Sequence, residues 1–167
     1  MKAVLAWVLI FLTLFTNAQK NCTPNLDSVK MMLYTDYISL TDIIQTLNLT
    51  TQNKKRYIPK FIRRALGCWR EGKFRIVNPG KYYNNTDAML GNRPTRQLTY
   101  LGSNANFLII AYNHGGFGFH EHILVFQYLN RIINKFWNIP GKANSKEEVI
   151  LRLKQMERNF RIKNFEF

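Results

Sequence analysis

Acidic residues are scarce in this sequence of 167 residues. Ten aspartate and glutamate residues stand against 24 lysine and arginine residues, which gives a formal net charge of +14. So few carboxylates leave little material for a catalytic carboxylate pair. The chain also lacks a glycine-rich phosphate loop, a serine nucleophile elbow and a cysteine–histidine pair at a recognisable spacing. We therefore expect no enzymatic activity and no cofactor.

The excess of positive charge favours acidic partners, among them glycosaminoglycans, anionic membrane surfaces and nucleic acids. The charge is densest at Lys54-Lys55-Arg56, from Lys60 to Arg64, and in the C-terminal helical segment. The alternative interpretation is a basic surface that is merely solvated. We expect no specific nucleic-acid partner and a monomeric chain.

Long hydrophobic runs are absent except at the N-terminus. Ala3 to Phe15 is apolar but falls short of the roughly 20 residues that a membrane-spanning helix needs. The run follows the positive Met1-Lys2 and precedes the small-residue site Thr16-Asn17-Ala18, as in a cleavable signal peptide. We predict a signal peptide over residues 1–18, a single domain over 19–167 and secretion to the extracellular space. An uncleaved membrane anchor is the alternative.

Cysteine is rare as well, since Cys22 and Cys68 are the only two in the chain. In an oxidising compartment one disulfide between them is the default, and two free thiols are the alternative. Three N-x-Ser/Thr sequons begin at Asn21, Asn48 and Asn84 and predict glycosylation. Each of these asparagines must lie on the surface if it carries a glycan.

Short apolar and aromatic segments with turn signals between them dominate the middle of the chain. Their alternation and composition predict strands at residues 73–78, 97–101, 106–112, 117–128 and 131–138. The earlier part of the chain carries weaker patterns. Residues 39–47 fit either a helix or a strand, and residues 61–66 fit a short amphipathic helix.

The clearest helix signal is a capping box, in which Ser145 is the N-cap and Glu148 is the third helical residue. We predict a helix over residues 145–158. Its apolar positions recur at helical spacing and must be buried against the sheet. These positions are Val149, Ile150, Leu153 and Met156.

The predicted strand at residues 106–112 is apolar on both faces. Phe107, Ile109 and Ala111 alternate with Leu108, Ile110 and Tyr112. In a single antiparallel sheet with one face in water, one of these sets would be polar. Two apolar faces indicate that one face lines an interior and the other is covered, as in a barrel strand beneath a helix.

In the C-terminal third, Asn134 to Gly141 is followed by Asn144 to Val149. These segments resemble the last barrel strand, exit turn and helix of the lipocalin family. Arg161 to Phe165 is similar to the short strand after the helix. The resemblance implies a mostly β fold, an antiparallel up-and-down eight-stranded barrel with one C-terminal α-helix packed outside. In that register the first strand lies near Leu33 to Tyr37.

This resemblance implies a secreted carrier that holds a small hydrophobic ligand, such as a lipid, fatty acid, retinoid or pigment, inside the barrel. A few residues are the candidates for lining the barrel: Tyr100, Phe107, Ile109, Tyr112 and Phe119. The rival hypothesis is a cationic extracellular interaction protein with a filled core. It would bind a glycosaminoglycan, a membrane surface or a protein partner through its surface.

His120 and His122 lie two residues apart on one face of a predicted strand, a geometry that metal ligands use. A metal site needs further ligands, and the only other histidine, His114, falls in the adjoining turn. The alternative is a pair of ordinary polar residues on a half-exposed strand. We expect no metal site and keep His120 and His122 as weak candidates.

Overall fold

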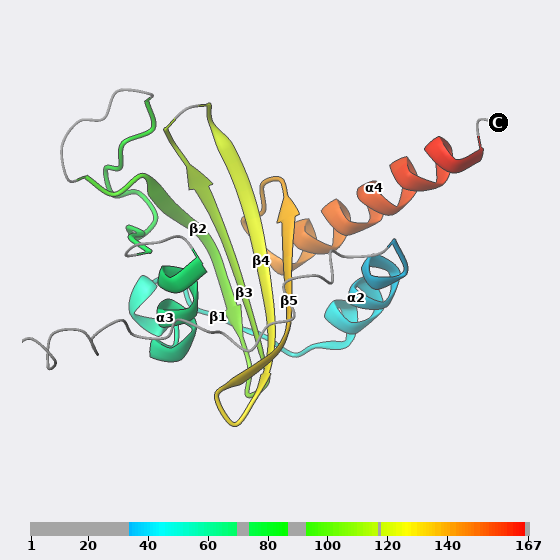
Figure 1. Ribbon diagram of the computed structural model, residues 1–167, viewed down its shortest axis with the longest axis horizontal. Coiled ribbons are helices and arrows are strands. Elements are labelled where there is room, and N and C mark those ends of the chain that lie inside the picture. The colour runs from blue at the N-terminus through cyan, green and yellow to red at the C-terminus, as the bar shows by residue number, and fades with distance from the viewer. Residues whose placement is uncertain (1–33, 70–73, 87–92, 117, 166–167) are drawn as a thin grey trace, which may run out of the picture.

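Five antiparallel strands form one open sheet in the order β1-β2-β3-β4-β5, so that each strand pairs with its neighbours in sequence. The computed structural model describes residues 34–69, 74–86, 93–116 and 118–165 (Figure 1). The strands are β1 (Thr50–Thr51), β2 (Arg96–Ser103), β3 (Phe107–His114), β4 (His120–Leu129) and β5 (Ile132–Pro140). The helices are α2 (Tyr34–Thr46), the short 3-10 helix η1 (Lys55–Tyr57), α3 (Lys60–Trp69) and α4 (Lys146–Phe165).

The predicted eight-stranded barrel is wrong. The described residues form an open sheet with β1 and β5 at its edges, and the three α-helices lie on both of its faces (Figure 1). The apolar pattern of β3 was correctly recognised, because the first six of its eight residues are buried. A sheet between two layers of helices buries both faces of a central strand as well as a barrel wall does. The pattern therefore did not distinguish the two architectures.

Two segments that the barrel would have needed as strands have other conformations. The first strand, placed at Leu33 to Tyr37, falls largely in α2, which begins at Tyr34. The segment predicted as a strand at residues 73–78 makes only an isolated bridge, between Val77 and Gln97. The alternation of apolar and polar residues in this segment reflects which side chains are buried and not pairing in a sheet, since Ile76 is buried and Arg75 is exposed.

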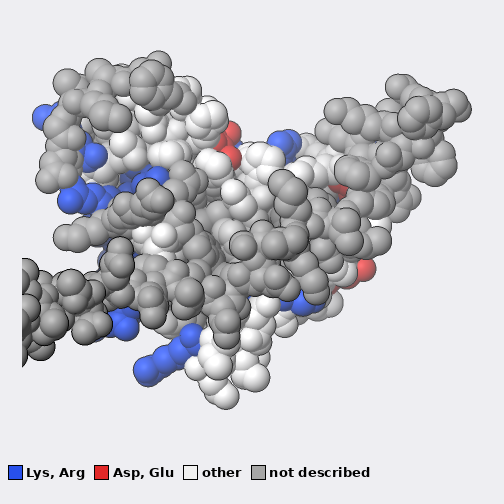
Figure 2. All heavy atoms as spheres, in the orientation of Figure 1, with Lys and Arg blue, Asp and Glu red and all other residues white. Residues whose placement is uncertain are grey.

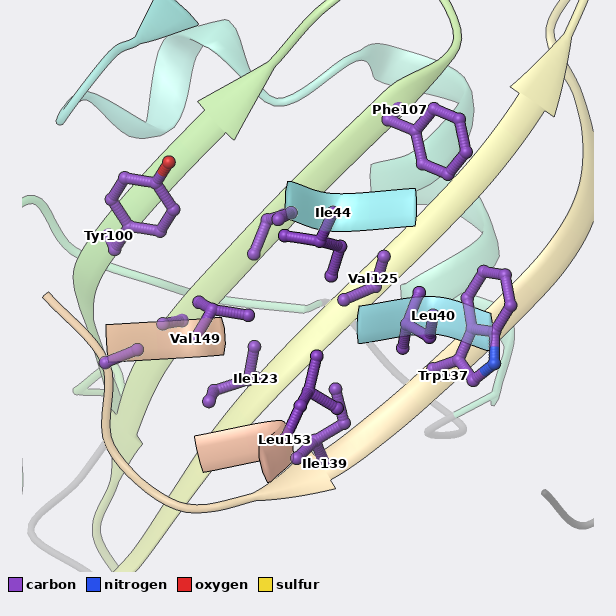
Figure 3. Packing of buried hydrophobic residues seen from close by; sticks show 13 residues of the cluster. Leu40, Ile44, Tyr100, Phe107, Ile123, Val125, Trp137, Ile139, Val149 and Leu153 are labelled. Atoms are coloured by element: carbon purple, nitrogen blue, oxygen red, sulfur yellow. The ribbon is translucent and has the colours of Figure 1, made fainter. Parts of the chain in front are cut away.

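The first face of the sheet is covered by α2 and α4. Leu40 and Ile44 of α2 and Val149 and Leu153 of α4 are fully buried against it, as Figure 3 shows. The strands contribute aromatic, β-branched and small side chains to this layer: Tyr100, Phe107, Ile109, Ala111, Ile123, Val125, Trp137 and Ile139. We call this layer the α2/α4 face.

The opposite face is covered by α3 together with residues just before and after it in the sequence. Ile58, Ile62 and Leu66 are buried there, together with Ile76. The strand residues of this layer are the alternate set: Leu98, Leu101, Leu108, Ile110, Tyr112, Leu124 and Phe126. We call this layer the α3 face. Each face has its own apolar core, and the sheet separates the two cores.

The predicted start of the C-terminal helix is confirmed. The Glu148 backbone N–H donates to the Ser145 hydroxyl at 3.2 Å, and the Glu148 carboxylate accepts from the Asn144 backbone N–H at 2.7 Å. The helix continues to Phe165, so the short strand predicted at Arg161 to Phe165 is wrong. No glycine or proline follows Gly141 in the sequence, and nothing local therefore ends the helix early.

Candidate functional site

The five residues proposed to line a ligand cavity do not surround one space. Tyr100, Phe107 and Ile109 belong to the core of the α2/α4 face. Tyr112 belongs to the α3 face, on the other side of the sheet. Phe119 precedes β4 and is 54% exposed. The first four therefore fill two separate cores, and the fifth faces solvent.

Tyr100 shows how closely the α2/α4 core is packed. Its side chain is fully buried, and its hydroxyl lies over Gly102, where any Cβ atom would overlap it. Burial raises the pKa of the Tyr100 phenol, against a smaller lowering effect of the Thr51 side chain. A Cβ atom at position 102 would therefore force the buried Tyr100 side chain to move.

All three histidines of the chain gather at one end of the α3 face. His114 of β3 is paired with His120 of β4, and His122 is paired with Tyr112. The His122 ring stacks on the Tyr112 ring with a centroid distance of 5.2 Å, and the His114 and His122 rings are 6.1 Å apart. His122 Nδ1 lies 3.2 Å from the Asn138 side-chain oxygen.

The His114, His120 and His122 rings contact one another and Tyr112, and His122 also contacts Asn138. Among the residues that the structure describes, no group of three His, Cys, Asp or Glu side chains has the geometry of a metal site. The weak candidates His120 and His122 have ring centroids 6.3 Å apart. The alternation of side chains along a strand predicted that His120 and His122 share one face. His114 lies beside them because the pairing of β3 with β4 places it opposite His120.

The disulfide and glycosylation predictions involve two residues, Cys22 and Asn21, that lie outside the described part of the chain. Cys68 lies in α3 and is disulfide-bonded, and its pairing with Cys22 stays a prediction. Asn48 is exposed, as a glycosylation site requires. Asn84 is only 5% exposed, and its side-chain oxygen accepts hydrogen bonds from the Thr86 N–H and hydroxyl at 3.1 and 2.9 Å.

The most concentrated charge on the described surface lies on η1 and α3. Six basic side chains are exposed within eleven positions: Lys54, Lys55, Arg56, Lys60, Arg63 and Arg64. We call this group the α3 basic surface. Residues 50–69 contain no aspartate or glutamate that could neutralise it. Figure 2 shows lysine and arginine side chains at several separate places on the left of the view, which include the loop above α3 in Figure 1.

The backbone beneath the α3 basic surface is fixed to the sheet. The Gln52 N–H donates to the Leu101 carbonyl at 2.8 Å, and the Lys55 N–H donates to the Asn78 side-chain oxygen at 2.8 Å. Ile58 and Ile62 are buried directly below the charged positions. The surface is therefore presented on a packed support, which reduces the entropy lost when a partner binds.

An exposed aromatic residue lies within this surface. The Arg56 guanidinium lies 4.9 Å from the centre of the Tyr57 ring, and its Nη2 donates to the Tyr57 hydroxyl at 2.9 Å. This hydrogen bond and the positive charge of Arg56 lower the pKa of the Tyr57 phenol. The pair orients Arg56 at the surface.

Charge in α3 opposes the helix dipole. Lys60 and Arg63 occupy its first turn, where the exposed backbone N–H groups already make a positive end, and no acidic residue is present there. Each such charge costs about 0.3–1 kcal/mol when exposed at low ionic strength. Because the placement does not help the helix, it is a local departure of the kind found at functional sites.

No family model, no curated protein and no solved structure matches this chain. Within the described residues, none of the helices has the length and apolar character needed to cross a membrane.

Proposed function

We propose that this protein is a cationic extracellular interaction protein that binds an anionic partner through the α3 basic surface. The observation that carries the proposal is the cluster of six exposed lysine and arginine side chains with no acidic residue between Asp42 and Glu71. Such a field attracts polyanions and accelerates their association. The extracellular location follows from the apolar N-terminal segment, which lies outside the described residues.

The carrier hypothesis depended on a closed barrel around a ligand, and the described strands form an open sheet. The rival hypothesis required a filled core. Side chains such as Ile109 and Ile110 are fully buried on opposite faces, each beneath its own helical layer. The sheet thus supports the surfaces around it and supplies no common interior.

The distribution of acidic residues supports the choice of the α3 side. On the α2/α4 side, Asp42, Glu147, Glu148 and Glu157 accompany the basic residues. An anionic partner would meet mixed charge there and unmixed positive charge on α3. Electrostatic complementarity of this kind steers binding to one side of a molecule.

The test is retention of the secreted protein on immobilised heparin, which serves as a sulfated polyanion probe, with elution by a sodium chloride gradient. The variant is Lys60→Ser/Arg63→Ser/Arg64→Ser. The matched control is Lys142→Ser/Lys154→Ser/Arg158→Ser, which removes the same charge from exposed positions elsewhere. We expect the α3 variant to elute at clearly lower salt than the control, because exposed charges act over about 10 Å at 0.1 M salt.

Equal elution of the two variants would contradict the proposal. Retention would then depend on the net charge of the whole chain and not on the α3 basic surface. Failure of the unmodified protein to bind heparin or any other polyanion above low salt would remove the proposal altogether.

A further inference from the structure

The turn between β4 and β5 exposes two large apolar side chains. Leu129 is 54% exposed and Ile132 is 64% exposed, and the two are directly paired across the hairpin. We call residues 129–132 the β4–β5 tip. In Figure 1 the tip extends beyond the helices at the bottom of the view. Two adjacent apolar side chains at the end of a projecting hairpin cannot be buried by the layers of the fold.

The backbone of the tip is costly to maintain. Asn130 and Arg131 have φ angles of 50° and 65°, the left-handed conformation of a two-residue hairpin turn. The second position of this turn favours glycine, because side chains with a Cβ crowd the backbone there. An arginine is present instead. Residues held in sparsely populated conformations occur preferentially at functional sites.

The tip begins beside the α3 basic surface. Tyr128, the residue before Leu129, packs edge-on against Phe61 of α3 with a ring centroid distance of 5.2 Å. Its hydroxyl donates to the Asn104 carbonyl at 3.0 Å. Since Phe61 follows Lys60 directly, the basic start of α3 and the base of the hairpin lie at the same end of the molecule.

The charge of the hairpin has the same sign as that of α3. Arg131 and Lys135 are the charged residues of the tip and β5, and no acidic residue occurs between Glu121 and Glu147. Apolar side chains with flanking basic residues match an anionic bilayer, whose headgroups attract the cations while its acyl region accepts the apolar groups. A sulfated glycan has no comparable apolar layer.

We infer that the anionic partner is a lipid bilayer that exposes acidic headgroups to the extracellular side, into which the β4–β5 tip inserts Leu129 and Ile132 while the α3 basic surface contacts the headgroups. This inference rests on the proposed function and names its partner. The two contributions differ in salt dependence. Headgroup attraction is screened by salt, whereas apolar insertion is not.

The test is co-sedimentation with vesicles of phosphatidylcholine and phosphatidylserine, compared with vesicles of phosphatidylcholine alone. The variant is Leu129→Ser/Ile132→Ser, and the matched control is Phe119→Ser/Leu151→Ser, which replaces two equally exposed apolar side chains elsewhere. We expect the tip variant to bind the acidic vesicles at least about tenfold more weakly than the control. Its elution from heparin should stay the same.

Insertion itself is measured with Leu129→Trp, whose fluorescence should be quenched by lipids brominated on the acyl chains. Absence of quenching, or equal binding of the tip variant and its control to acidic vesicles, would overturn the inference. The proposed function would still stand in that case if the α3 variant lost heparin and vesicle binding. Binding to heparin with no binding to acidic vesicles would assign the α3 basic surface to a sulfated glycan instead.

Discussion

The two helical layers that cover the sheet differ in where their charged residues lie relative to the helix ends. On the α2/α4 side, Glu147 and Glu148 lie at the positive end of α4, and the Lys146 ammonium donates to the Gln45 and Leu47 carbonyls at the end of α2. The glutamates stabilise the start of α4 and the Lys146 ammonium stabilises the end of α2, but Lys146 is also the first residue of α4, where its charge opposes the dipole of that helix as Lys60 does in α3. On the α3 side, Lys60 and Arg63 lie at a positive helix end. Burial supports both layers, and in the first Glu147 and Glu148 and the hydrogen bonds of Lys146 also contribute to stability.

This contrast indicates what each layer contributes. In the α2/α4 layer the fold explains Glu147, Glu148 and the hydrogen bonds of Lys146. In α3, Lys60 and Arg63 oppose the helix dipole, and the proposed binding to an anionic partner would account for them. Stability and function are often in such conflict at binding surfaces.

The largest expected effect concerns the buried anchor of α4. Leu153→Ala should lower the free energy of unfolding by about 2–5 kcal/mol, because a fully buried leucine leaves a cavity when truncated. Leu151→Ala is the control, since Leu151 is 57% exposed and should change stability by less than about 0.5 kcal/mol. Urea unfolding of both variants measures the difference. A neutral Leu153→Ala would mean that α4 does not pack on the sheet.

A smaller loss is expected at the start of the same helix. Ser145→Ala removes the hydroxyl that accepts from the Glu148 N–H and should cost about 1 kcal/mol. Urea unfolding is again the measurement. Ser145→Asn, which retains a capping oxygen, should restore most of the loss. If serine, alanine and asparagine proved equivalent, the cap would contribute nothing to the stability of this layer.

Removing charges from α3 should not lower the free energy of unfolding, in contrast to the two substitutions at α4. Lys60→Gln/Arg63→Gln/Arg64→Gln, which keeps a similar helix propensity, should leave the free energy of unfolding unchanged or raise it by up to about 1 kcal/mol at low salt, because unfavourable dipole contacts are lost. Lys146→Ser should destabilise, because the carbonyls at the end of α2 lose their donor. Thermal unfolding of both variants compares the layers directly. Marked destabilisation of the α3 variant would show that these charges serve the fold after all.

The smallest effect is a pH dependence at α4. Hydrogen bonds from the backbone and from Ser145 lower the pKa of the Glu147 carboxyl. A lowered pKa contributes stability above its unfolded value and loses that contribution as pH falls through the folded value. Glu147→Gln should therefore be slightly less stable than the parent near neutral pH, and the difference should disappear as the pH falls through the lowered pKa of Glu147. If Glu147→Gln remained less stable than the parent in acid, the difference would have a cause other than the ionisation of Glu147.

Much of the sheet could be predicted from sequence, because alternation and turn residues are local signals. The segments at 97–101, 106–112, 117–128 and 131–138 correspond to β2 to β5. The capping box likewise gave the start of α4 from Ser145 and Glu148. Helix α2 was missed as such, because residues 39–47 fitted a helix and a strand equally well.

What covers a sheet is not a local property. The residues of β3 indicated two buried faces, but they carry no information on whether a barrel interior or a helix lies against each face. The candidate site shows the same limit. The basic stretches around Lys54 and Lys60 were visible in sequence, whereas the exposure of Leu129 and Ile132 depends on how far the hairpin projects beyond the helices.

The central claim is that the protein meets its partner through the α3 side. Hydrogen–deuterium exchange in the presence and absence of heparin fragments tests it most directly, because protection maps where the polyanion lies. The account predicts slower exchange over residues 54–64 and no change over α4 from Lys146 onward. Protection confined to α4, or to the buried strands β3 and β4 without the α3 segment, would contradict it.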